Sequence, residues 1–425
     1  MLVTMVFQTL YFLVDLYWVG RLGKEAIAGV GIAGNLTFIV LAITQMLAVG
    51  TTTLIAHASG RKEREQAQLV LTQSLLLAVF IGALFLIIVT AGHNAYVNRL
   101  SPDPVSAAAA TSYLSWFIPA MALQFPMVVM AAALRGTGNF KPGMVVQTAT
   151  VIINIVLAPV LMFGWLGTRP MGVAGAGLAS LIAIVVGTLW LAFYFFETAS
   201  YLKLHPHFKP NAGIWAKVLK IGLPAGVEFG LIAVYLVVVY TVSRPFGAAA
   251  QAGFGIGQRI TQAGFMPIVA LGFAVAPVAG QNFGARKAER VLETFRRAAL
   301  MAASIMALFT LLCLAAGKAM IGFFSSDPAV IAIGAEYLRL ISWSLVAGGV
   351  VFVNGSMFQA MGNTIPPLIA SFMRILVVAI PAILLSRVAG FELRWIWYLS
   401  VAATILQLGM NLALLRREFR IRLAF

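Results

Sequence analysis

Twelve long apolar segments divide this chain, and they restrict its fold more than any other feature of the sequence. Each holds about 20 residues or more, enough for a helix that rises about 1.5 Å per residue to cross a bilayer. Within lipid, a helix pairs all the backbone groups of one segment internally. The sequence therefore predicts an all-α integral membrane protein of twelve transmembrane helices, at about residues 1–20, 30–55, 68–91, 108–132, 143–164, 173–196, 217–242, 252–278, 298–324, 331–358, 366–386 and 395–415.

Positive charge is abundant and lies mainly in the loops between these segments. Of 425 residues, 61% are hydrophobic and 10% are charged, and the formal net charge is +16. With the N-terminus placed in the cytoplasm, the cytoplasmic loops hold more than twice as many Lys and Arg residues as the opposite side. Such a bias sets the orientation of membrane proteins, and it accounts for the net charge without a nucleic-acid partner. We expect a multi-pass protein of a bacterial inner membrane, with both termini in the cytoplasm.

The first apolar segment begins at Met1. It has no basic stretch before it and no small-residue cleavage site after it, so it does not resemble a signal peptide. We expect this first helix to be truncated, with its natural start upstream of Met1.

An internal repeat organises the chain. When the sequence is shifted by 224 positions, residues 26–161 align without a gap with residues 250–385 and share at least 25 identities. Each repeat holds six spans, so both halves enter the membrane the same way round, which is a known arrangement in secondary transporters. The sequence predicts two pseudo-symmetric six-helix lobes joined by a cytoplasmic linker: an N-terminal lobe at 1–196, the linker at 197–216 and a C-terminal lobe at 217–425.

The repeat also conserves local signals within the chain. Asp103-Pro104 and Asp327-Pro328 each place an N-cap residue before a proline, which predicts a helix start. Gly138-Asn139 and Gly362-Asn363 each precede a proline and predict tight turns between spans.

Two acidic residues lie well inside apolar segments, Asp15 in the first and Glu228 in the seventh. A carboxylate is costly in hydrocarbon and usually faces a cavity, a partner or an ion path. Asp15 is either a site for a coupling ion or an interfacial carboxylate paired with Arg21 or Lys24. Glu228 is either a counter-charge for a cationic substrate, or a second proton site, or a structural glutamate bonded to a neighbouring helix.

Further polar residues inside the spans are candidates for a substrate cleft. Arg259 and Arg374 are the notable cations, and Arg259 is a candidate partner of Glu228. Uncharged polar side chains inside the spans, such as Asn35, Gln258 and Asn354, either line a cavity or bond one helix to another. The candidates for substrate binding are Glu228, Arg259, Asn35, Gln258 and Asn354.

Near the start of the tenth span, Glu336 and Arg339 are three residues apart, which favours a local pair.

Several stretches resemble the multidrug and toxic compound extrusion (MATE) family. They are VDLYWVGRLG with AIAGVGIAGN, ALRGTGNFKP, NIVLAPVLMFG with MGVAGAGLAS, GLPAGVE, and AVAPVAGQNFGARKAER. Each motif is modest by itself, but their order is specific and the resemblance covers nearly the whole chain. It implies a secondary antiporter that exports amphipathic, often cationic organic compounds in exchange for protons or sodium ions by rocking of two lobes.

The resemblance also implies roles for individual residues. Asp15 matches the aspartate of the family's first helix, and Asn154 matches an asparagine of its fifth helix; both are expected to serve ion coupling. Glu228 matches a glutamate of the seventh helix. Two positions depart from the family pattern: Ala158 stands where several members have aspartate, and Asn354 where many have an acidic residue. The chain is expected to act as a monomer without a cofactor, on drug-like small molecules.

Two other classes of protein are considered. A lipid-linked oligosaccharide flippase of the same broad superfamily would use Arg259 and Arg374 to bind an anionic substrate. A membrane-embedded enzyme is not expected, because the sequence holds no paired-aspartate magnesium motif, no HExxH and no nucleophile elbow.

Overall fold

The structure is a computed structural model of the chain, and it describes residues 14, 17–101, 103–167, 169–197, 201–204, 208–388 and 390–424. In these residues every regular element is a helix, as predicted. Eleven helices are long and apolar enough to cross a membrane. Most of the first predicted segment, including Asp15, lies outside the described residues. The prediction of an all-α, multi-pass membrane protein is therefore confirmed.

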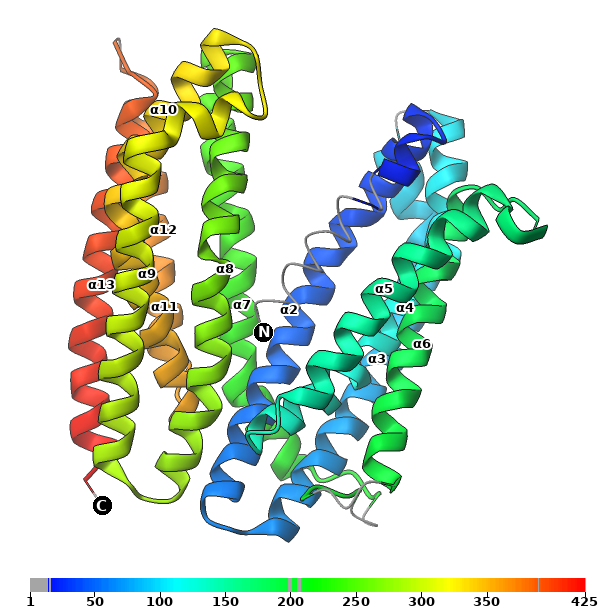
Figure 1. The fold of residues 1–425 in the computed structure, drawn as a ribbon, viewed down its shortest axis with the longest axis vertical. Helices are drawn as coiled ribbons and strands as arrows, with labels where there is room; N and C mark the ends of the chain where they lie inside the picture. The colour runs from blue at the N-terminus through cyan, green and yellow to red at the C-terminus, as the bar shows by residue number, and fades with distance from the viewer. Residues whose placement is uncertain are drawn as a thin grey trace. The chain divides into compact units, whose positions relative to one another are not determined.

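The helices follow the predicted segments in order (Figure 1). The tenth predicted span is made of three elements, α10, η3 and α11, which follow one another directly. The elements are α2 (Lys24–Gly60), α3 (Arg64–Leu100), α4 (Pro104–Gly136), α5 (Lys141–Phe163), η1 (Trp165–Gly167), α6 (Val173–Glu197), α7 (Ala212–Ser243), η2 (Arg244–Phe246), α8 (Ala248–Gly284), α9 (Ala288–Gly322), α10 (Pro328–Ile341), η3 (Ser342–Ser344), α11 (Leu345–Ala360), α12 (Ile365–Leu385) and α13 (Arg394–Arg422).

Two compact units make up the chain, Met1–Gly226 and Val227–Phe425. The division falls inside α7, some way beyond the predicted boundary between residues 216 and 217. Glycines of α7 explain the difference, since they bring its first half against α2. A Cβ at Gly226 would lie 2.7 Å from the carbonyl oxygen of Ala42, and one at Gly222 would collide with the carbonyl oxygen of Met46. Such close approach of two backbones requires small residues.

The segment before α7 is hydrogen-bonded to α3. The side chain of Gln73 is fully buried. Its Nε2 donates to the carbonyl oxygen of Lys209 at 2.9 Å, and its Oε1 accepts from the backbone N–H of Asn211 at 2.8 Å. Arg64 Nε donates to the carbonyl oxygen of Tyr201 at 2.9 Å. These bonds satisfy loop backbone groups that no helix pairs.

The repeat is visible in the backbone of each unit. Positive φ angles recur at equivalent glycines, 83° at Gly138 and 74° at Gly362, and both glycines stand in the predicted turns. Two residues other than glycine also have positive φ angles, Lys62 at 61° and Arg286 at 56°, and they are equivalent positions of the two repeats. Because residues other than glycine seldom adopt positive φ, this coincidence indicates that the two turns have the same structure.

The close contacts between helices repeat as well. A Cβ at Gly29 of α2 would lie 2.8 Å from the backbone nitrogen of Ala110 in α4. At the equivalent position of α8, a Cβ at Gly253 would lie 3.0 Å from the backbone nitrogen of Gly334 in α10. The AGVGIAG and AGFGIGQ stretches therefore serve helix packing in both units.

Both predicted N-caps are confirmed. Oδ1 of Asp103 accepts the backbone N–H groups of Val105 and Ser106 at 2.9 and 2.8 Å. Oδ1 of Asp327 accepts the N–H of Ala329 at 2.8 Å. The side chains satisfy N–H groups that have no partner within the helix.

Candidate functional site

Glu228 is held in a hydrogen-bonded chain that joins three helices of the second unit. The hydroxyl of Ser371, on α12, donates to Oε1 of Glu228, on α7, at 2.7 Å. The same hydroxyl accepts from Nε2 of Gln407, on α13, at 3.0 Å. Ser371 and Gln407 are buried, with exposed fractions of 6% and 5%, whereas Glu228 is partly buried. The Ser371 hydroxyl therefore gives one oxygen of this carboxylate a hydrogen-bond partner inside a membrane-spanning helix.

A second group of polar side chains lies on the same three helices. Arg374 of α12 places its guanidinium over the ring of Tyr235 of α7, 5.5 Å from the ring centroid. The Tyr235 hydroxyl lies 3.0 Å from Oγ of Ser400 in α13. The charge of Arg374 acts on both Tyr235 and Glu228. Its Nε is buried and has no hydrogen-bond partner in the described part of the chain.

Helical spacing explains why these groups meet. Residues three, four or seven apart lie on the same face of a helix. Ser371 and Arg374 are three apart on α12, and Glu228 and Tyr235 are seven apart on α7. On α13, Ser400 and Gln407 are seven apart as well. One polar face of each helix therefore carries both groups, which are about two turns apart along α7 and α13.

The arrangement has a definite chemical capacity. Glu228 can hold one proton or remain ionised, and its ionised form is compensated by the Ser371 hydroxyl and the nearby charge of Arg374. Nε of Arg374 has no acceptor among the described residues and can donate to a further group. No group of three or more His, Cys, Asp or Glu side chains among the described residues could hold a metal ion.

Asn154, predicted for ion coupling, lies in the first unit. It is buried at 5% exposure. Its Nδ2 donates to Oγ of Ser180 in α6 at 2.9 Å, and that hydroxyl donates to the carbonyl oxygen of Ala176 at 3.1 Å. Ala158, one turn later on α5, is 1% exposed. Asn154 thus bonds α5 to α6; Asp15, its predicted companion, lies outside the described residues, so ion coupling here stays a prediction.

The structure separates the predicted substrate-binding residues of the second unit. Oε1 of Gln258 accepts from the Tyr337 hydroxyl at 2.8 Å, which joins α8 to α10. Asn354 is fully buried in α11, and both polar atoms of its amide lack a partner in the described part of the chain. Arg259 is exposed and is not the partner of Glu228, whose carboxylate is bonded to Ser371.

Two more predictions are placed by the structure. Asn35, the predicted residue of the first unit, is exposed on α2. The expected local pair of Glu336 with Arg339 is wrong: Glu336 lies 3.8 Å from Arg394, at the start of α13. Glu336 therefore pairs with a residue of another helix rather than with Arg339, its neighbour in sequence.

Sequence reasoning missed four residues of the site, Ser371, Gln407, Tyr235 and Ser400. Each is an ordinary residue in an apolar segment when it is considered alone. The available signal was spacing, because Ser371 shares a helix face with the intramembrane Arg374 and Tyr235 shares one with Glu228.

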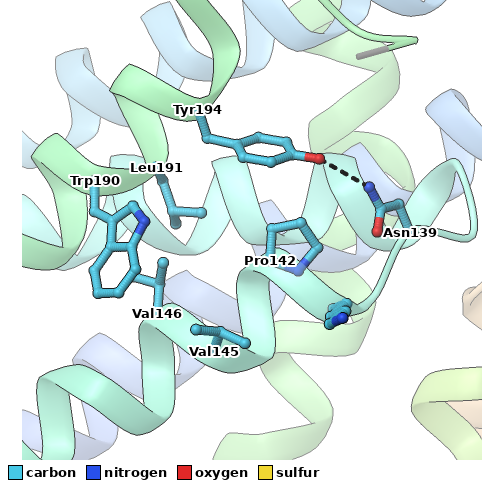
Figure 2. A pocket seen from close by; sticks show the side chains of 8 residues that line it. Asn139, Pro142, Val145, Val146, Trp190, Leu191 and Tyr194 are labelled. Carbon is cyan, nitrogen blue, oxygen red and sulfur yellow. Dashed lines mark hydrogen bonds between the residues drawn. The ribbon is translucent and has the colours of Figure 1, made fainter. Parts of the chain in front are cut away.

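A shallow groove of about 350 Å³ lies between α5 and α6 in the first unit (Figure 2). Asn139 and Tyr194 close one side of it, with Nδ2 of Asn139 donating to the Tyr194 hydroxyl at 3.1 Å. Trp190 and Lys141 also line it. Aromatic and basic residues of this kind are typical of membrane interfaces. None of the predicted site residues lines this groove.

Two repeated helical halves, with charged groups inside the membrane-spanning helices, define the class of protein as a polytopic membrane transporter. Within that class the chain belongs to the MATE family, since it matches MatE over residues 1–160 and 224–385. The resemblance stated from the sequence motifs is therefore confirmed.

Curated relatives agree with this assignment, and a solved structure has a similar fold. The chain is 25% identical over 377 residues to the probable multidrug resistance protein NorM of Thermotoga maritima, covering 88% of this chain and 81% of that protein. It is 24% identical to the multidrug export protein MepA of Staphylococcus haemolyticus, covering 95% and 89%. Its fold is similar to that of a MOP superfamily transporter from Pyrococcus furiosus, with a TM-score of 0.91 at 24% identity, covering 99% of this chain and 94% of the other.

Proposed function

We propose that this protein is a secondary active antiporter that exports amphipathic, often cationic organic compounds in exchange for protons or sodium ions. The names of the relatives support the export of drug-like molecules. The observation that carries the ion-coupled part is the bond from Ser371 to Glu228, because it holds a carboxylate that can gain and lose a proton inside a membrane-spanning helix.

In this proposal, the protonation state of Glu228 couples ion binding to substrate binding. Ionised Glu228 offers a negative charge to a cationic substrate, and a protonated Glu228 does not. Binding of a proton and binding of the substrate then compete, so that uptake of one favours release of the other. Asp15 is proposed as a second ion-coupling residue, and Asn154 as its companion. Rocking of the two lobes, with both termini in the cytoplasm of an inner-membrane protein, would expose the sites alternately.

Transport in proteoliposomes tests this function. We expect ethidium to leave vesicles containing the parent protein when either a pH gradient or a sodium gradient is imposed, and the effective gradient identifies the ion. Glu228→Gln and Asp15→Asn should each lower that efflux about tenfold or more, because an amide cannot exchange a proton. Glu336→Gln removes a carboxylate whose partner, Arg394, also pairs with Glu392, and serves as the matched control. Parent-like efflux by both acid variants would refute the ion-coupled function.

The alternative, a lipid-linked oligosaccharide flippase, keeps one supporting observation: Nε of Arg374 has no hydrogen-bond partner in the part of the chain that the structure describes. It predicts that an anionic lipid-linked sugar binds to the purified protein and that Arg374→Met abolishes this binding. Binding of ethidium without binding of such a lipid would exclude it. We favour the antiporter, since the names of the relatives support the export of drug-like molecules.

A further inference from the structure

One face of α13 is polar from Ser400 to Arg422, apart from the apolar Leu415. Helical residues separated by three, four or seven positions share a face, and polar side chains occur here at such intervals from the first turns of α13 to its last. All but the last are buried, with exposed fractions of 1% to 9%. We call this set the polar face of α13: Ser400, Thr404, Gln407, Asn411, Glu418 and Arg422.

The N-terminal half of the polar face reaches Glu228. Gln407 donates to Ser371, and Ser371 donates to Glu228, at 3.0 and 2.7 Å. Among the described residues, Arg374 of α12 is a charged group that acts on Glu228.

The C-terminal half reaches the end of the helix bundle. Oε1 of Glu418 accepts from Nδ2 of Asn363 at 2.9 Å and pairs with Nε of Arg422 at 2.6 Å. Nη1 of Arg422 donates to the carbonyl oxygen of Met361 at 2.8 Å. The Arg422 side chain is 38% exposed. Asn363 and Met361 belong to the turn between α11 and α12, so this half of the face ends at an aqueous surface.

Unpartnered amides lie between the two halves. Asn411 of α13 is 1% exposed and Asn354 of α11 is fully buried. Oδ1 of Asn411 and both amide atoms of Asn354 have no hydrogen-bond partner in the described part of the chain. Buried polar atoms of this kind are normally paired with protein or with ordered water.

Contacts at the helix ends place these two amides at the same level. α11 and α13 pack together and run in the same direction, with α12 between them in sequence. Met361 is bonded to Arg422, and counting back seven residues along both helices places residue 354 level with residue 415. Asn363 is bonded to Glu418, and counting back nine residues places residue 354 level with residue 409. Asn411 lies within that interval. Asn354 therefore supplies a polar group where the apolar Leu415 interrupts the face of α13.

A buried water needs two to four polar partners, and these unpartnered amide atoms at similar levels of α11 and α13 supply polar groups of that kind. Asn411 lies about one turn of α13 from Gln407 and about two turns from Glu418. Amide groups do not themselves carry protons at neutral pH; they hold waters that do.

We propose that the polar face of α13, together with Asn354, is the pathway by which Glu228 exchanges its proton with the aqueous phase at the C-terminal end of α13. The proposal rests on the proposed ion-coupled function. One proton leaves the Glu228 carboxyl group, each bound water accepts one proton and passes one on, and one proton enters solvent beside Glu418. The reverse sequence reprotonates Glu228. No bond other than O–H bonds forms or breaks.

Comparison of two transport modes in the same proteoliposomes tests this pathway. Efflux of ethidium driven by a pH gradient requires proton transfer, whereas exchange of labelled for unlabelled ethidium at equal pH on both sides does not. We expect Asn411→Leu to lower the pH-driven efflux about tenfold while exchange remains within about twofold of the parent, because leucine cannot hold a water. Asn411→Ser, which keeps a polar side chain, should restore most of the efflux.

Met410→Leu is the matched control, since it changes the neighbouring position without touching the polar face. Equal efflux by Asn411→Leu and Met410→Leu would overturn the pathway, as would loss of both transport modes in the correctly inserted leucine variant. Efflux of the parent driven by sodium alone would overturn the proton pathway and leave the antiporter intact. No gradient-driven efflux by the parent would instead refute the ion-coupled function on which the pathway rests.

Discussion

The Ser371 hydroxyl donates to Glu228 at 2.7 Å across 143 positions of sequence. This bond connects the intramembrane carboxylate of α7 to α12, and through Gln407 to α13. A carboxylate is tolerated within a membrane when the protein supplies donors and a nearby positive charge. Ser371 and Arg374 supply these from one face of one helix.

Removal of the serine hydroxyl should destabilise the protein and leave its fold intact. In Ser371→Ala, Glu228 loses its donor and Gln407 its acceptor, and each buried unsatisfied group costs about 1–3 kcal/mol. We expect a lower apparent melting temperature in detergent by intrinsic fluorescence. Ser386→Ala, which removes an exposed hydroxyl bonded to the carbonyl oxygen of Ile383, is the control and should melt like the parent. Equal melting of the two variants would contradict the assigned bond.

The contact of Arg374 with Tyr235 should contribute measurable coupling. A cation over an aromatic ring contributes about 0.5–2 kcal/mol, depending on its burial. We expect a double-mutant cycle with Arg374→Met and Tyr235→Leu to give a coupling energy in that range. Tyr235→Phe keeps the ring, so its coupling with Arg374→Met should be preserved while the bond to Ser400 is lost. Additive effects of methionine and leucine would exclude the contact.

Close packing of α7 on α2 should tolerate no side chain at Gly222. Alanine there would place a Cβ against the carbonyl oxygen of Met46, and overpacking of this kind costs about 1–3 kcal/mol. We expect Gly222→Ala to lower the apparent melting temperature and the yield of folded protein. Gly230→Ala lies two turns further along the same helix, where a Cβ meets no atom within 4 Å, and should behave like the parent. Indistinguishable melting of the two variants would show that the helices do not approach this closely.

The two N-caps of the repeat should differ in strength. Asp103 accepts two backbone N–H groups and also the Ser106 hydroxyl at 2.8 Å, whereas the Asp327 carboxylate accepts one backbone N–H. Loss of an N-cap costs about 0.5–2 kcal/mol. We therefore expect Asp103→Ala to lower the apparent melting temperature more than Asp327→Ala. Asparagine at either position should recover part of the loss, because it can also cap a helix. The reverse order would contradict the capping geometry.

Much of the architecture followed from the sequence by itself. Segment length predicted the spans, since the bilayer fixes how long an apolar helix must be. The repeat predicted equivalent turns at Gly138 and Gly362, and the Asp-Pro pairs predicted the starts of α4 and α10. These features depend on neighbours in the chain or on its periodicity, and both can be read without knowledge of which helices meet.

The partners of the charged residues were decided only by the tertiary structure. Glu228 is bonded to Ser371 rather than to Arg259, and Glu336 pairs with Arg394 rather than with the nearby Arg339. Within a lipid-facing helix the apolar residues are nearly interchangeable, so its sequence leaves the rotation about its axis undetermined. Packing of small residues such as Gly222 against a neighbouring backbone fixes that rotation, and with it which polar side chains face one another.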